Sequence, residues 1–165
     1  MTDRTEKNII LQFKHVKVDY QVKEGLVKSV DNVTFDVEKG KITALIGESG
    51  SGKSTLTGTI LRILAPNGKI SPESKIIFHG KDILEMTEHE VRDFRWRRAS
   101  VVFQAAQNAL NPTVRIKAQI LDTLTDHGKN WRDSKYRERL GNLFSMVRLD
   151  PKRVLHAYPH ELSGG

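Results

Sequence analysis

The sequence has 165 residues, with 27 Lys and Arg against 20 Asp and Glu and no Cys. This length allows one core, or a core with a small second unit, and the lack of Cys excludes a disulfide framework and a thiolate metal site. The net charge of +7 permits an anionic partner but names none. No apolar run reaches the roughly 20 residues of a membrane-spanning helix. The polar N-terminus has no signal-peptide core, so we expect a soluble intracellular protein.

Residues 9–38 predict an antiparallel pair of strands. In residues 9–20 the apolar positions alternate, but their parity changes after Phe13, which indicates a bulge or a break between two short strands. Residues 21–28 contain a glycine and are predicted to form a hairpin loop. Apolar residues alternate again in residues 33–37, which predicts a half-buried strand.

Residues 42–64 predict a buried strand, a glycine-rich loop and a helix. The run 42–46 is nearly continuous apolar sequence, as in a parallel strand covered on both faces. Residues 47–55, GESGSGKST, match the phosphate-binding pattern G-x-x-x-x-G-K-[ST]. Its fixed positions are Gly47, Gly52, Lys53 and Ser54. In residues 56–64 apolar side chains recur on one helical face, so the loop has the strand before it and the helix after it that the pattern requires.

The residue types of this loop suit a nucleotide phosphate. Glycines let the backbone curl so that successive N–H groups point at one anion, and the amino end of the next helix adds its positive dipole. Lys53 can reach the β- and γ-phosphates, and the Ser54 hydroxyl can ligate Mg²⁺. The alternative, a flexible Gly/Ser loop, is disfavoured by the complete pattern between a strand and a helix. We therefore predict a nucleotide site.

A second passage of strands and a helix follows. Residues 76–78 predict a short strand, and Thr87–Glu90 has the form of a capping box that opens a helix to about Arg97. Residues 100–103 predict a second buried strand, with Gln104 at its end. Because ligands gather at the carboxyl ends of strands in open α/β sheets, Gln104 lies where polar chemistry is expected.

Residues 113–158 change character and predict helices only. Apolar residues at helical spacing indicate one helix over 116–128 and another over 140–147. Asp150–Pro151 then has the form of a cap followed by proline at a first helical position. This pattern predicts an α/β core with an all-helical insert after Gln104.

Several motifs fall in a characteristic order. Tyr20 precedes Gly47 by 27 residues, and the loop is followed by VFQ at 102–104, ALNP at 109–112 and YPHELSGG at 158–165. In this order they resemble the motifs of the ATP-binding subunit of an ABC transporter, and their residues are most similar to those of the oligopeptide/dipeptide importer branch. The resemblance covers the whole chain except its first few residues.

The resemblance implies a P-loop NTPase core of the α/β class with an N-terminal antiparallel β subdomain and an all-helical insert. The first two would occupy residues 8–104. The loop after Gln104 and the helical subdomain would occupy residues 105–165, which leaves the core sheet incomplete and the remainder of the ATPase domain absent. The implied function is the ATP-binding part of an importer ATPase subunit, which couples ATP binding and hydrolysis to the uptake of a peptide-like solute or an oligosaccharide. Such a subunit would be cytoplasmic and peripheral on the inner face of the membrane.

The resemblance also assigns roles to matching positions. Tyr20 would stack on adenine, although it could instead be a sheet aromatic facing the core. The ATP phosphates and Mg²⁺ would be bound by Gly47, Ser49, Gly50, Ser51, Gly52, Lys53, Ser54 and Thr55. Gln104 would contact the attacking water or, with Ser54, the Mg²⁺ ion, so Lys53 and Gln104 are the expected catalytic residues. Ser163 and Gly165 would bind the γ-phosphate held by a second, facing subunit.

Two kinds of partner are implied as well. One is a second ATP-binding subunit, identical or different, that sandwiches the nucleotide. The other is the membrane-spanning permease subunits, contacted through the Gln104 loop and the helical subdomain. Basic residues interleaved with aromatics at 92–98 and 129–137 could bind nucleic acid, but no nucleic-acid motif accompanies them. We interpret them as solvated helix faces and predict no nucleic-acid partner.

One departure from the family pattern bears on turnover. The pattern continues beyond the LSGG signature with an apolar strand that carries an Asp and a catalytic Glu, and with a later switch His, and the 165 residues contain neither. Phosphoryl transfer depends on positioning and charge stabilisation, so we expect weak Mg-ATP binding and very slow hydrolysis. Whether the chain is an enzyme stays open, with a non-catalytic nucleotide-binding regulatory module as one alternative. An ABC-type ATPase of DNA maintenance is disfavoured, because no coiled-coil heptads are visible.

Overall fold

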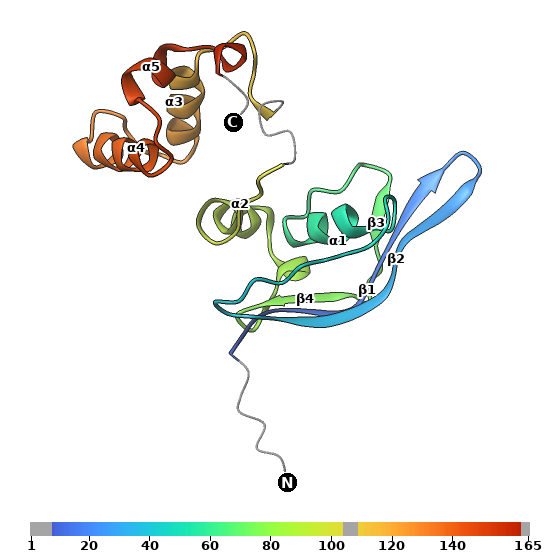
Figure 1. The fold of residues 1–165 in the computed structure, drawn as a ribbon. Coiled ribbons are helices and arrows are strands. Elements are labelled where there is room, and N and C mark those ends of the chain that lie inside the picture. The colour runs from blue at the N-terminus through green and yellow to red at the C-terminus, as the bar shows by residue number, and fades with distance from the viewer. Residues whose placement is uncertain (1–7, 104–108, 163–165) are drawn as a thin grey trace. The chain divides into compact units, whose positions relative to one another are not determined.

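The computed structural model describes residues 8–103 and 109–162. By its internal contacts the chain divides into two compact units, Met1–Ser100 and Val101–Gly165. The first unit contains a sheet with helices, and the described residues of the second form helices and turns (Figure 1).

The first unit is built on a long hairpin. β1 (Ile9–Val22) pairs antiparallel with β2 (Gly25–Glu38). Only residues 23–24 lie between the strands, and Gly25 adopts a positive φ of 135° at the turn. The predicted hairpin is confirmed, but the predicted loop over 21–28 is wrong, because the ladder pairing continues up to the turn.

β1 changes its buried face near its middle. Leu11 and Phe13 are buried, and so are Val16 and Val18, although the two pairs have opposite parity. His15 lies between them at a φ of 51°, and the register with β2 shifts between Phe13 and Val16. The irregularity turns the strand so that both pairs face one core. The bulge expected from the parity change is confirmed.

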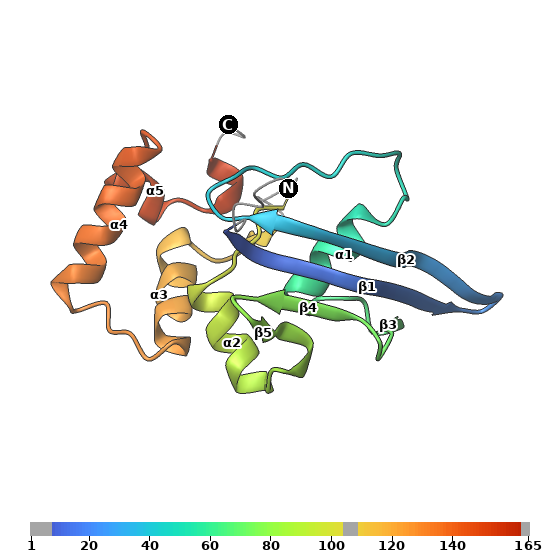
Figure 2. The ribbon, with the colours of Figure 1, turned by 90° about the horizontal axis from the view of Figure 1, so that it is seen from below.

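Three short strands extend this sheet, which Figure 2 shows from below. β3 (Gly68–Ile70) and β4 (Lys75–Phe78) both pair with β1, and β5 (Lys81–Asp82) pairs with β4, all antiparallel. The strand order is β2-β1-β4-β5, with β3 also on β1. β4 confirms the strand predicted over 76–78. β3 and β5 were not predicted, because three and two residues are too few to show a period.

Two helices lie on one side of the sheet (Figure 1). They are α1 (Lys53–Ile60) and α2 (Glu88–Arg97), and the 3-10 turn η1 (Ile83–Glu85) precedes α2. The core consists of Leu11, Phe13, Val16, Val18, Val30, Leu56, Leu61, Ile76, Ile83 and Phe94. The helix predicted over 56–64 is confirmed in its first part only, because the backbone reaches a φ of 51° at Arg62.

Two predicted strands do not form. In the described part of the chain, residues 42–46 and 100–103 belong to no strand, so both predictions are wrong. The side chains of Ile42, Ile46 and Val102 are 100%, 94% and 88% exposed. A strand needs a neighbour for its ladder hydrogen bonds, and among residues 8–103 and 109–162 no strand pairs with either segment. The core sheet is therefore incomplete, as expected.

The second unit is helical, as predicted for residues 113–158. It contains α3 (Ile116–Asp126), α4 (Ser134–Met146), α5 (Pro151–His156) and the 3-10 turn η3 (Pro159–Glu161). α3 and α4 both contact α5. The Asp150 carboxylate accepts a hydrogen bond from the Lys152 N–H at 2.9 Å, which confirms the predicted cap before Pro151. Along the described residues, no helix combines the length and the apolar character that a membrane crossing requires.

α2 begins with the predicted capping box. Thr87 Oγ1 accepts a hydrogen bond from the Glu90 N–H at 3.3 Å, and the Glu90 carboxylate accepts one from the Thr87 N–H at 2.8 Å. The Lys81 ammonium also binds the Glu90 carboxylate. The Lys81 contact first, and then the Thr87 N–H, lower the pKa of Glu90 from 4.5 to about 2.

We expect Glu90→Gln to weaken the dependence of the folding stability on pH in the acid range. The pKa of Glu90 is lower in the folded state, so the carboxylate contributes stability that is complete above pH 4.5 and is lost as the pH falls to about 2. Across this range the melting temperature of the wild type should therefore fall more steeply than that of Glu90→Gln. Lys81→Met should remove most of the difference, because Lys81 is the main cause of the shift. Parallel melting curves for all three proteins would contradict this prediction.

Candidate nucleotide-binding site

The glycine-rich loop leads into α1, which begins at Lys53. Gly50 and Gly52 have φ angles of 81° and 84°, in the left-handed region that favours glycine. A Cβ on Gly52 would lie 2.1 Å from the carbonyl oxygen of Ser29 in β2, so only glycine permits this approach. The amino end of α1 is thereby held against β2, at the edge of the described sheet.

A second contact holds the same helical turn on β2. The Ser29 hydroxyl donates to Thr55 Oγ1 at 3.0 Å, and the adjacent Leu56 is buried in the core. The Thr55 side chain, expected at the phosphate, therefore contacts the sheet, and its backbone N–H in the first turn of α1 is the group that can face an anion. Sequence reasoning missed Ser29, because the contact joins two segments that share no local pattern.

The Lys53 ammonium closes the loop on itself. It donates to the carbonyl oxygens of Gly47 and Glu48 at 2.9 and 2.6 Å, and to Ser51 Oγ at 3.1 Å. The Ser51 N–H donates in turn to the Glu48 carbonyl oxygen at 3.3 Å. Residues of the motif thus surround one cation, and an anion that binds Lys53 has to replace these oxygen acceptors.

The amino end of α1 fits an anionic phosphate. Among the described residues, no side chain caps this end and no acid lies in its first turn. The first-turn N–H groups and the positive end of the helix dipole are therefore open to an anion beside Lys53. Ser54, the second residue of α1, is exposed, so its hydroxyl can face Mg²⁺. The structure brings together on one loop and helix turn Gly47, Ser49, Gly50, Ser51, Gly52, Lys53, Ser54 and Thr55.

Tyr20 lies in β1 opposite Val27 of β2 and Gly68 of β3. A Cβ on Gly68 would lie 2.7 Å from Tyr20 Cε1, so the ring covers this glycine. The ring is half-buried and packs against the core cluster. This is the position of a sheet aromatic, and the stacking of Tyr20 on adenine stays a prediction.

The other expected site residues, Gln104, Ser163 and Gly165, lie outside the described residues. Within residues 8–103 and 109–162, no group of three or more His, Asp or Glu side chains could hold a metal ion. In the described part of the site, Mg²⁺ would therefore depend on the Ser54 hydroxyl and on phosphate oxygens rather than on a carboxylate cluster.

One cavity of the first unit borders the phosphate-binding loop, and another does not. A pocket of about 390 Å³ lies between β2 and the loop. Its lining combines Gly47, Gly52 and Lys53 of the loop with apolar side chains such as Phe35 and Ile46. This pocket therefore borders the loop residues that are expected to bind phosphate. A cavity of about 650 Å³ is lined by residues of β4, β5 and α2 and by none of the loop.

Comparisons with known proteins find relatives that are ATP-binding proteins, in agreement with the phosphate-binding motif of residues 47–55. A protein-family model described as ABC transporter matches residues 30–165. The chain is 40% identical over 158 residues to a dipeptide transport ATP-binding protein of Caldanaerobacter subterraneus, covering 96% of this chain and 48% of the relative. It is 30% identical over 160 residues to the oligopeptide transport ATP-binding protein of Escherichia coli, covering 97% and 47%. The chain spans about half the length of the curated relatives it matches.

Solved structures share the fold. An ATP-binding cassette, solved as a dimer in a post-hydrolysis state bound to ADP and Pi, has a TM-score of 0.74 at 23% identity, covering 94% of this chain and 64% of that one. The protein cbiO1 from Clostridium perfringens, part of the ABC transporter complex cbiONQ, has a TM-score of 0.69 at 24% identity over 94% of this chain and 56% of that one. At these identities the similarity shows the fold alone: a P-loop ATPase fold with an N-terminal antiparallel β subdomain.

We expect Gly52→Ala to separate α1 from β2. The new Cβ would meet backbone, which cannot move aside as a side chain can, at a φ of 84° that already disfavours alanine. The loss of stability should be about 1–3 kcal/mol. Gly141→Ala is the matched control, because a Cβ in α4 there meets nothing within 4 Å. In a denaturant titration the control should be neutral or stabilised by about 0.5–1 kcal/mol, and equal midpoints for the two variants would refute the prediction.

Proposed function

This chain belongs to the ABC transporter family, and we propose that it is the ATP-binding part of the ATPase subunit of a peptide importer. The observation that carries the proposal is the loop of residues 47–55, with the uncapped amino end of α1 beside the Lys53 ammonium. The names of the relatives support the solute class, since the relatives in the previous section are dipeptide and oligopeptide transport proteins.

The loop residues would divide the work of binding ATP. The Lys53 ammonium would leave its carbonyl acceptors and bind the β- and γ-phosphates, while the first-turn N–H groups of α1 donate to phosphate oxygens. Ser54, with Gln104, would hold Mg²⁺, which when bound supplies positive charge between phosphate oxygens. Tyr20 would contact the adenine. Lys53 and Gln104 are the residues we assign to the reaction centre.

The proposed partners follow from the family. A second ATP-binding subunit would face this one, with Ser163 and Gly165 at the γ-phosphate of the partner's nucleotide, and a cassette of this fold solved as a dimer supports such pairing. Permease subunits would be contacted through the segment after Gln104 and the helical unit. The complex would place this chain on the inner face of the membrane.

We expect Lys53→Met to weaken Mg-ATP binding at least tenfold, since it removes the only motif cation and its charge-assisted hydrogen bonds, worth about 1.5–3 kcal/mol. Isothermal titration calorimetry gives the Kd. Lys69→Met is the matched control, because Lys69 is an exposed cation on β3. If both variants bound Mg-ATP as the wild type does, the proposed site would be wrong.

Turnover is the second test. The 165 residues contain no apolar segment ending in Asp-Glu, so the chain should bind Mg-ATP and release phosphate very slowly. A chain extended to the length of its relatives should release phosphate at least about a hundredfold faster, because aligned catalytic groups contribute several kcal/mol to such a reaction. Equal phosphate release from the two proteins would contradict this part of the proposal.

A further inference from the structure

α1 is short and is weakly stabilised by its own sequence. It has eight residues, no basic residue in its last turn, and no side-chain cap among the described residues. Isolated helices shorter than about 12 residues are marginal in water. Leu56, Thr59 and Leu61 are buried, but apolar packing is not directional and leaves the orientation of the helix axis loosely defined.

The carboxyl end of α1 is closed by a left-handed cap. The Arg62 N–H donates to the Thr59 carbonyl oxygen at 3.1 Å, and the Ile63 N–H donates to the Gly58 carbonyl oxygen at 3.0 Å. These two bonds form a Schellman motif, in which the residue in the left-handed conformation is usually glycine. Arg62 occupies this position at a φ of 51°. Arg148 ends α4 with the same two bonds at a φ of 57°, so the backbone conformation alone does not distinguish Arg62, and its side-chain contacts have to do so.

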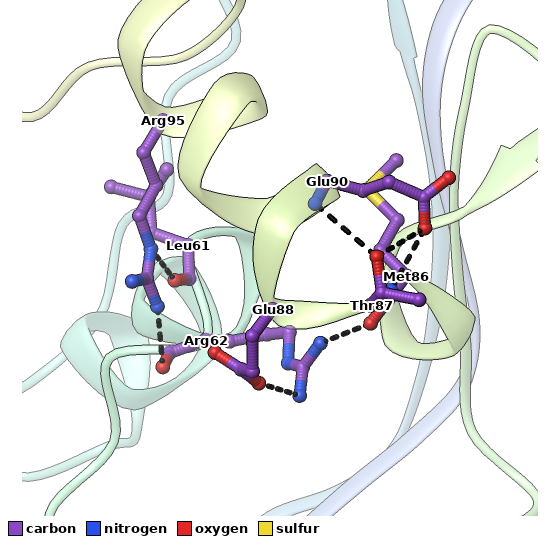
Figure 3. Close-up of polar contacts among 7 residues, drawn as sticks. All are labelled: Leu61, Arg62, Met86, Thr87, Glu88, Glu90 and Arg95. Atoms are coloured by element: carbon purple, nitrogen blue, oxygen red, sulfur yellow. Dashed lines mark hydrogen bonds and ion pairs between the residues drawn. The ribbon is translucent and has the colours of Figure 1, made fainter. Parts of the chain in front are cut away.

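The Arg62 side chain reaches the start of α2. Its guanidinium donates to the Met86 carbonyl oxygen at 2.6 Å and to the Glu88 carboxylate at 2.9 Å (Figure 3). Met86 precedes the capping residue Thr87, and Glu88 is the first residue of α2. The side chain of Arg62 is 28% exposed and that of Glu88 is 81% exposed, so the bond to the Met86 carbonyl is the better shielded of the two contacts.

A second arginine binds in the opposite direction. Arg95 of α2 donates from Nε to the Leu61 carbonyl oxygen at 2.7 Å and from its NH2 group to the Arg62 carbonyl oxygen at 3.1 Å (Figure 3). These carbonyl groups follow the last turn of α1, where the negative end of the helix dipole favours a cation. The two guanidinium groups thus cross between the helices. Arg62 binds the Met86 carbonyl before α2 and the Glu88 side chain, and Arg95 binds the two carbonyl groups that follow α1.

We propose that Arg62 and Arg95 are positioning residues for the phosphate loop. By binding the carboxyl end of α1 to α2, they hold its amino end, and with it Lys53, in place for an anion. α1 is a rod roughly 12 Å long, at about 1.5 Å per residue. One end touches β2 through Gly52 and Ser29. Without a directional contact at the other end, the rod can pivot on that point and move its first-turn N–H groups. The proposal rests on the proposed ATP site.

The test compares variants that remove one guanidinium each. Arg62→Gly is the informative one, because glycine is the favoured residue at this backbone position and only the side-chain contacts are lost. Arg95→Gln removes the hydrogen bonds to the Leu61 and Arg62 carbonyl groups, and the double variant removes the contacts of both guanidinium groups. Arg97→Gln is the matched control, because Arg97 lies on the same helix and carries the same charge but pairs with Asp93 on the surface.

Two measurements are made on the whole 165-residue chain. Native-state hydrogen exchange without nucleotide reports the opening of α1 and the loop. We expect Arg62→Gly and Arg95→Gln each to speed exchange in residues 47–60 about tenfold and to raise the Kd for Mg-ATP about five- to tenfold. Exchange in β1 and β2 should not change. The double variant should lose less than the product of the two single effects, because both act on one contact between helices.

Specific outcomes would overturn the inference. If Arg62→Gly left exchange in α1 unchanged or slowed it, Arg62 would serve only to end the helix. Faster exchange with an unchanged Kd would show that the position of α1 does not govern anion binding, and equal effects of Arg97→Gln would indicate a general charge effect. Failure of the wild type to bind Mg-ATP would contradict the proposed function. In that case unchanged exchange in the variants would overturn this inference too, and exchange accelerated only in residues 47–60 would support it.

Discussion

The close approach of Gly52 to the Ser29 carbonyl oxygen is the contact on which the rest of the first unit depends. No side chain stands between the backbone of α1 and the backbone of β2 at this point. The helix can therefore start at the sheet surface with its first-turn N–H groups uncapped, while Leu56, one turn later, enters the core. A side chain at position 52 would push α1 outward, and the core would open along the β2 side of the sheet.

A helix whose amino end is kept for a ligand has to be stabilised elsewhere. A missing side-chain cap costs about 1 kcal/mol, and a cation at the carboxyl end of a helix contributes typically about 0.3–1 kcal/mol and up to about 2 in good geometry. Arg95 supplies that cation from α2, since α1 has no basic residue in its last turn. The Ser29–Thr55 hydrogen bond adds a further fixed contact. The contacts at the carboxyl end of α1 therefore offset the stability that the helix loses by leaving its amino end uncapped for a phosphate.

The features predicted well from the sequence are those with a local physical cause. The parity change after Phe13 requires a bulge, and Thr87–Glu90 closes a capping box within one helical turn. The glycine pattern of residues 47–55 likewise specifies a loop with its own geometry. The wrong predictions depend on partners distant in the chain. Apolar content correctly marks residues 42–46 and 100–103 as segments that favour burial, but strand formation needs a paired neighbour, and apolar content says nothing about whether one is present. Ser29 and Arg95 were missed for the same reason.

The exposed segment 42–46 also bears on how the loop is held. On its helix side the loop is fixed by the contact of Gly52 with β2, but on its entry side the backbone has no ladder partner among the described residues. There the Lys53 ammonium, bound to the Gly47 and Glu48 carbonyl groups, keeps the loop closed. When a phosphate binds Lys53, the hydrogen bonds from the ammonium to the Gly47 and Glu48 carbonyl groups break, and the entry side of the loop is less well held. The net binding free energy of the phosphate is smaller by the energy of those bonds. Pairing of residues 42–46 with another strand would hold the entry side independently of Lys53. The pairing of residues 42–46 and the affinity of the loop for phosphate are therefore coupled through the Lys53 ammonium.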